Sequence, residues 1–140
     1  MKLSIAIMIL CAAFAVNAKA QTAAPQTIRA NVPFTFTVGD KTLPAGVYTV
    51  RILNPASDRK ALQIRSEDGH FSAIIQTVAV KGSLADNAKL VFRRYGERHF
   101  FAKVQLAGDS TSFATTKNHT ERATERALKH PARNTEIAAL

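Results

Sequence analysis

Residues 32–50 read VPFTFTVGDKTLPAGVYTV and contain two runs in which apolar and polar residues alternate. Phe34, Phe36 and Val38 form the first run, and the second continues from Tyr48 through Val50 to Ile52. A period of two places the apolar side chains on one face of a half-buried strand. Gly39-Asp40 and Pro44-Ala45-Gly46 lie between the runs and favour a turn and a bend. The stretch therefore predicts two antiparallel strands that pair with each other.

The same reasoning, extended along the chain, predicts strands at 28–38, 47–53, 61–65, 71–80, 89–95 and 99–106. The first should break at Val32-Pro33, because proline donates no ladder hydrogen bond. Residues 71–80 are apolar on both faces, which is typical of a central strand buried on both sides. Short strands separated by turns favour an all-β fold, a small antiparallel sandwich or barrel of about six to seven strands.

The N-terminus has the organisation of a signal peptide. Met1-Lys2 is a positively charged start, residues 3–16 are an apolar run, and Ala18-Lys19-Ala20 matches a small-x-small cleavage pattern. An uncleaved anchor is the alternative, but the run is short for a membrane-spanning helix. We expect cleavage after Ala20 and export to the periplasm or the extracellular space. The single cysteine, Cys11, would be removed with the signal peptide.

The remaining chain divides into three predicted parts. Residues 21–26 form a flexible lead-in, 27–116 the β-domain, and 117–140 a polar tail. Within the tail a short helix is expected near residues 118–130, with Thr120 as its cap and Pro131 after its end. Because this segment has almost no apolar face, the tail is expected to be mobile.

The charge distribution suggests a partner. The chain has a net charge of +9, and loss of residues 1–20 removes Lys2 and Lys19, leaving +7. No carboxylate falls within a predicted strand, whereas several cations do, some of them at positions that alternate with apolar neighbours. These tentative polyanion-binding residues are Arg51, Arg65, Arg93 and Lys103. They predict a basic outer face, with no acid opposite, for an acidic polysaccharide or an anionic lipid surface. Alternatively, they are ordinary solvent-facing residues that protect strands from edge pairing.

Catalytic motifs are absent from the sequence. It contains neither a Gly-x-Ser-x-Gly nucleophile motif nor a phosphate-binding glycine loop. The four histidines, at positions 70, 99, 119 and 130, lack the neighbours that a metal site or a general base needs. We therefore expect no enzyme activity, cofactor or metal. A hydrolase would have to use His99 and Glu97 with a third polar group in a cleft.

Two segments carry a family resemblance. Residues 28–39 together with Leu43-Pro44-Ala45-Gly46-Val47-Tyr48 resemble an uncharacterised family of small exported bacterial β-proteins, whose pattern is Pro-Phe-x-Phe-x-Val-Gly followed by Leu-Pro-Ala-Gly-x-Tyr. Residues 62–66 and 89–96 are also similar to later parts of it. The resemblance implies an exported β-domain and assigns no activity. It implies that Gly39, Pro44–Gly46 and the three rings at 34, 36 and 48 determine the fold.

Two functions follow from these features. The first is an exported, non-enzymatic domain that binds an acidic envelope partner through the basic face. The second is a structural or assembly subunit that pairs with another protein through a sheet edge. A contiguous basic face would favour the first, and a long unprotected edge strand the second. Nucleic acid is an unlikely partner, because no nucleic-acid-binding module is recognisable.

Overall fold

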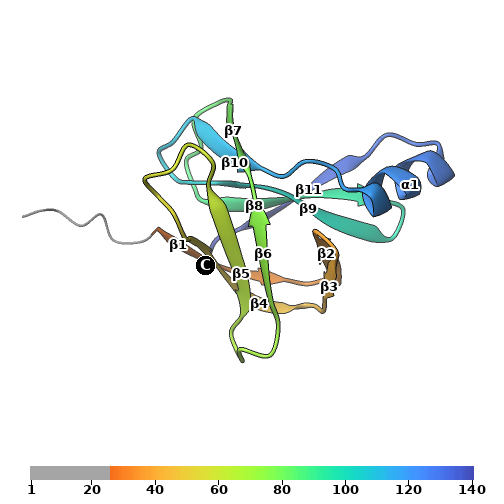
Figure 1. Ribbon diagram of the computed structural model, residues 1–140, viewed down its shortest axis with the longest axis horizontal. Helices are drawn as coiled ribbons and strands as arrows, with labels where there is room; N and C mark the ends of the chain where they lie inside the picture. The colour runs from red at the N-terminus through yellow and green to blue at the C-terminus, as the bar shows by residue number, and fades with distance from the viewer. Residues whose placement is uncertain (1–25) are drawn as a thin grey trace, which may run out of the picture.

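The computed structural model describes residues 26–140, so the predicted signal peptide lies outside the described residues. Within this range, eleven strands and one helix form two sheets around one core (Figure 1). The predicted small all-β sandwich is confirmed, and neither sheet closes into a barrel, since both strand orders have two ends.

The first sheet has four antiparallel strands, and the second is larger. The four-stranded sheet has the order β1 (Thr27–Val32), β4 (Gly46–Ile52), β5 (Ala61–Ser66) and β6 (Ser72–Gln76). The larger sheet has the order β11 (Arg133–Ala138), β8 (Lys89–Tyr95), β9 (Arg98–Gln105), β10 (Thr111–Ala114) and β7 (Val78–Lys81). A hairpin of β2 (Phe36–Val38) and β3 (Lys41–Leu43) joins the larger sheet, because β2 runs parallel to β9.

Aromatic rings from both sheets meet in the core. Phe36 lies edge-on to Tyr48 and to Phe92, with ring centroids 5.0 and 5.2 Å apart. Phe92 in turn lies edge-on to Phe101 at 5.8 Å. Such edge-to-face pairs add about 0.5–1.5 kcal/mol each to the free energy gained from burial. The rings expected from the sequence at 36 and 48 are buried, and Phe34 is half-buried against the same cluster.

The two alternating runs do not pair with each other, and that prediction was wrong. β4 pairs with β1, whereas β2 pairs with β3. The chain breaks at Pro33, as expected, and this break moves it from the four-stranded sheet to the larger one. The two runs therefore face each other across the core. Gly39 turns the chain with a φ of 57°, and the Tyr48 hydroxyl donates to the Pro44 carbonyl oxygen at 2.6 Å, which fixes the bend.

Residues 71–80 do not form a central strand. The segment divides at Thr77 into β6, at one end of the four-stranded sheet, and β7, at one end of the larger sheet. Hydrophobicity on both faces predicted double-sided burial, but Ile74, Val78 and Val80 are exposed. The segment instead changes sheets, with buried Thr77 at the crossing.

The predicted mobile tail contains ordered elements. The helix α1 (His119–Leu128) was expected, but its cap is Asn118, whose side chain accepts from the Glu121 amide at 2.8 Å. Beyond it, β11 pairs with β8 over six residues. Ile137 and Ala139 pack against the core. The strand β11 was not expected from the sequence, because Ile137 is its one large apolar residue.

Candidate functional site

The outer edge of β6 carries backbone groups that no strand pairs. The backbone N–H of Ser66 donates to the Phe71 carbonyl oxygen at 2.8 Å, and the backbone N–H of Thr77 donates to that of Lys60 at 2.9 Å. These two bonds show which residue pairs of β5 and β6 are hydrogen-bonded to each other. Hydrogen-bonded pairs alternate along an antiparallel ladder. The intervening residues Ser72, Ile74 and Gln76 therefore direct their N–H and C=O groups away from β5, towards the free edge.

A groove lies beside this edge. It has a volume of about 430 Å³, and its opposite wall is the β2–β3 turn. The lining residues are Val38, Gly39, Asp40, Lys41, Ser72, Ala73 and Ile74. The Ile74 side chain is 64% exposed, which is unusual for an uncharged β-branched residue in a sheet. The groove thus combines unpaired backbone with an apolar side chain.

One cation, Lys41, lines the groove at Ser72, and a second, Arg65, lies on the neighbouring strand β5. Lys41 donates from its Nζ to the Ser72 carbonyl oxygen at 3.0 Å. Arg65 is the cross-strand partner of Ser72 on β5 and is exposed. A lysine on a sheet edge hinders uncontrolled pairing, because its charge must be matched by any arriving strand. The Ser72 carbonyl oxygen at this edge is thus already bound by a lysine side chain.

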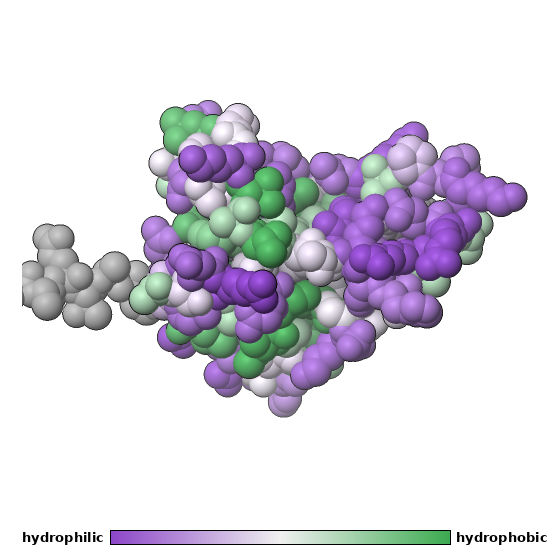
Figure 2. Space-filling model, turned by 45° about the horizontal axis from the view of Figure 1, so that its top comes forward, coloured by the Kyte–Doolittle hydropathy of each residue, from purple (hydrophilic) through white to green (hydrophobic). Residues whose placement is uncertain are grey.

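The edge continues into β7, where all four residues are exposed. Val78 and Val80 are 46% and 43% exposed. On the face drawn in Figure 2, hydrophobic residues gather over the half of the molecule away from α1, and the surface around α1 is almost wholly hydrophilic. β6 and β7 thus form one nearly continuous edge segment, Ser72–Lys81, which is bent at Thr77.

The four predicted polyanion-binding residues are not brought together on one sheet. Arg51 and Arg65 lie on the neighbouring strands β4 and β5 of the four-stranded sheet, opposite Gln63 and Thr49 respectively. Arg93 and Lys103 lie on β8 and β9 of the larger sheet. β4 alternates in burial as expected, whereas β8 and β9 each bury three consecutive residues. The sequence carried no signal for which strands share a sheet.

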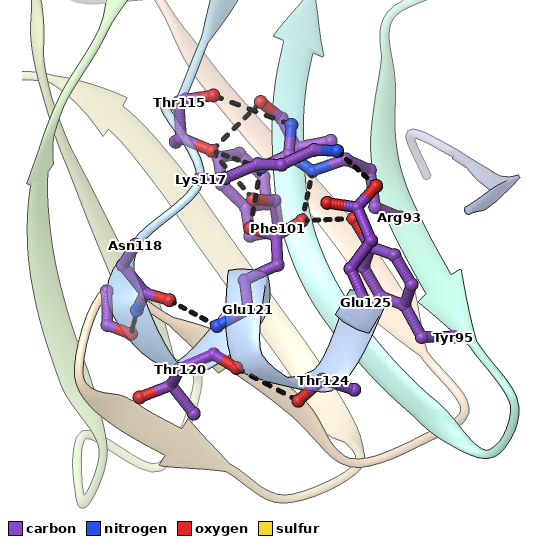
Figure 3. A network of polar contacts seen from close by, with 12 residues as sticks. Arg93, Tyr95, Phe101, Thr115, Lys117, Asn118, Thr120, Glu121, Thr124 and Glu125 are labelled. Carbon is purple, nitrogen blue, oxygen red and sulfur yellow. Dashed lines mark hydrogen bonds and ion pairs between the residues drawn. The ribbon is translucent and has the colours of Figure 1, made fainter. Parts of the chain in front are cut away.

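Arg93 is occupied by an acid, contrary to the expectation that none lies opposite the cations. Its guanidinium binds the Glu121 carboxylate through two nitrogens, with one contact at 3.0 Å. The Arg93 side chain is 16% exposed and that of Glu121 is 3% exposed. Figure 3 shows Glu121 reaching from α1 to the sheet, where Tyr95 also donates to it at 3.1 Å. This network attaches α1 to the larger sheet.

A second ion pair lies beside the first. Lys117 binds Glu125 at 2.7 Å, and its Nζ lies 5.9 Å from the centre of the Tyr95 ring. The hydrogen bond to Glu125 raises the pKa of Lys117 above its usual value. Burial, together with the charge of Glu121, raises the pKa of Tyr95. Both groups therefore keep their protons at neutral pH, which suits a structural role.

The histidines are dispersed. Among residues 26–140, no three histidine, cysteine or acidic side chains form a group that could hold a metal ion. His99 stacks on Phe34, with ring centroids 3.8 Å apart. Its buried Nδ1 has no hydrogen-bond partner in the described part of the chain. Burial, with a contribution from nearby Arg94, lowers the pKa of His99.

Comparisons with known proteins give no relative: no family model, no curated protein and no solved structure matches the chain. In the part of the chain that the structure describes, no helix is long and apolar enough to cross a membrane.

Proposed function

We propose that the protein is an exported, non-enzymatic binding module that captures an extended, acidic segment of an envelope protein by strand addition at β6. The observation that carries this proposal is the unpaired outer edge of β6 beside a groove. An added strand gains main-chain hydrogen bonds from the edge, and its side chains give specificity. Export rests on the sequence of residues 1–20.

The chemistry of the edge defines the segment. One side chain should be apolar, to cover Ile74 on the outward face of the sheet. A carboxylate opposite Ser72 would lie beside Lys41, which lines the groove. Asp40 also lines the groove, so its lining carries both charges. The preference for an acidic segment therefore needs its own test.

A backbone-specific variant tests the proposal. Because the Ile74 N–H faces the free edge, Ile74→Pro removes a donor that strand addition needs and leaves the β5–β6 ladder intact. A display library of short random peptides would be selected on the wild-type protein. We expect selected peptides to alternate β-branched and polar residues, to carry an acid, and to lose binding to Ile74→Pro. Ile74→Val is the matched control, because it keeps both the donor and an apolar side chain.

The result would be read by affinity and by NMR. Contacts between peptide Hα atoms and those of β6 would establish strand pairing, and exchange of the peptide acid for lysine should weaken binding. Equal binding by folded Ile74→Pro and wild type would refute strand addition at β6. Selected peptides that bind equally well with lysine in place of the acid would refute the charge preference alone.

A polyanion-binding role remains as a second candidate, reduced to Arg51 and Arg65. These two side chains are exposed on adjacent strands of one face. Binding to acidic polysaccharides and anionic vesicles at several salt concentrations would test it with Arg51→Ser/Arg65→Ser. Lys103→Ser/Arg122→Ser is the control, since it removes the same charge elsewhere. Equal loss in both double variants would indicate only non-specific attraction.

A further inference from the structure

A second cavity lies at the other end of the molecule, between the β8–β9 turn and the segment that joins α1 to β11. Its volume is about 320 Å³. The lining residues are Arg94, Tyr95, Gly96, Leu128, His130, Pro131 and Arg133. Two arginines and a histidine therefore line one hollow, and none of the lining residues is acidic. This volume falls within the range of small-molecule sites.

The two arginines lie in an unfavourable arrangement. Arg94 and Arg133 are direct cross-strand partners in the β8–β11 pair. Like charges placed directly opposite each other destabilise a sheet. His99 is the partner of Arg94 on the other side, so three basic side chains share one row across β9, β8 and β11.

The compensation within the chain is weak. Arg94 binds Glu97 at 3.4 Å, but the Glu97 side chain is 95% exposed. The Arg94 Nε also donates to the Gly96 carbonyl oxygen at 2.7 Å, which orients the guanidinium. Among the described residues, Arg133 forms no ion pair. The repulsion is thus left for a ligand to relieve.

We infer that this cavity binds a small organic oxyanion, a phosphate or carboxylate group on a short apolar body. Arginines in pairs suit such groups, because each guanidinium offers two parallel N–H donors to two oxygens. An oxyanion between Arg94 and Arg133 would turn their repulsion into two attractions. Leu128 and Pro131 provide an apolar wall for the carbon body, and the volume exceeds that of a bare phosphate ion.

Calorimetric titration of the full chain at low salt tests this inference. The probes are phenyl phosphate and benzoate, with phenol as the neutral analogue and inorganic phosphate as the anion without an apolar body. We expect phenyl phosphate or benzoate to bind at least about tenfold more tightly than phenol, a difference of about 1.4 kcal/mol. Ligand binding should also raise the unfolding temperature of the wild type.

Three variants identify the site. Arg133→Gln should weaken binding about tenfold or more and abolish the rise in unfolding temperature. Within residues 26–140 it breaks no ion pair. Arg94→Gln should act alike. Arg122→Gln removes the same charge from the exposed side of α1 and should leave the affinity unchanged.

The results separate the outcomes. Binding of phenol as tight as that of benzoate, no binding of either oxyanion, or equal loss in Arg122→Gln would overturn the inference. Inorganic phosphate that binds as tightly as phenyl phosphate would overturn the role of the apolar wall. Failure here leaves strand addition at β6 untouched, since the two sites share no residue.

Discussion

At the scale of single residues, Glu121 has the most demanding environment in the described chain. It is an acid with a 3% exposed side chain that accepts from Arg93 and Tyr95. Glu121→Gln would leave a largely buried guanidinium without its counter-charge. Breaking a buried pair in this way costs about 3–5 kcal/mol. Urea denaturation should show a loss of this size in the free energy of unfolding.

Glu125→Gln is the matched control for Glu121→Gln. It removes the same charge from the same helix, but the Lys117–Glu125 pair is about one third exposed. Solvent screening keeps such pairs below about 1 kcal/mol. A similar loss in the two variants would contradict a special role for the Arg93–Glu121 pair.

His99 should make stability depend on pH. Burial lowers the pKa of His99 in the folded state below its ordinary value of 6.5. The unfolded chain then binds this proton more readily, so stability rises with pH across the interval between the two pKa values. We expect the contribution of His99 to be complete above about pH 6.5 and to be lost as the pH falls through the lowered folded pKa.

Thermal unfolding from neutral to mildly acidic pH measures this effect. His99→Phe keeps a ring against Phe34 and should flatten the dependence in that range. Asp68 responds in a separate range, because its hydrogen bond from Ser66 lowers its pKa below 3.8. A profile unchanged by His99→Phe would contradict the assignment.

At the scale of elements, β11 changes the interpretation of the C-terminal segment. Ile137 is half-buried against the core and lies opposite Leu90 on β8. Ile137→Ala should therefore cost about 1–2 kcal/mol, below the range for a fully buried isoleucine. Leu140→Ala, at a side chain 70% exposed, should change stability by less than about 0.5 kcal/mol. If chemical denaturation showed equally negligible effects for both variants, the interpretation of the C-terminal segment as a mobile tail would stand.

The sequence could predict elements with their own periodicity. The predicted strand at 89–95 has the same bounds as β8. The sequence could not predict which strands pair, because the same alternation suits either sheet. For that reason the runs that became β2 and β4 were wrongly predicted to pair with each other. The edge position of β6 escaped detection as well, since an exposed Ile74 and a buried isoleucine are alike in sequence. The structure shows where the segment changes sheets: the Thr77 hydroxyl donates to the carbonyl oxygen of Lys60, a residue distant in sequence.

The candidate site was predictable only in part. Alternation correctly placed Arg51 and Arg65 on solvent-facing positions. Alternation also predicted an exposed Arg93. That prediction was wrong, because the sequence cannot show that α1 folds back and brings Glu121 to it. The cavity at Arg94 and Arg133 was missed for the same reason, since β11 itself was not expected.

At the scale of the whole molecule, we expect the exposed edge strand β7 to favour self-association at high protein concentration. Val78 and Val80 lie on an edge strand whose four residues are all exposed, and such edges favour pairing between molecules. Val80→Lys should reduce self-association in sedimentation experiments at high concentration without changing stability by more than about 0.5 kcal/mol. Arg126→Lys, on exposed α1, is the neutral control. Unchanged self-association would show that β7 is protected in solution.

The two ends of the described chain meet at the opposite side of the sandwich. Leu140 donates to the Arg29 carbonyl oxygen at 2.8 Å, and Ala139 donates to that of Ala88 at 2.9 Å. A chain that emerges N-terminus first from a ribosome or a translocation channel therefore contains β1 and β8 before residues 133–140 emerge. Until then the edge of β8 that β11 covers in the complete sheet is unpaired, and such an edge can pair with other chains.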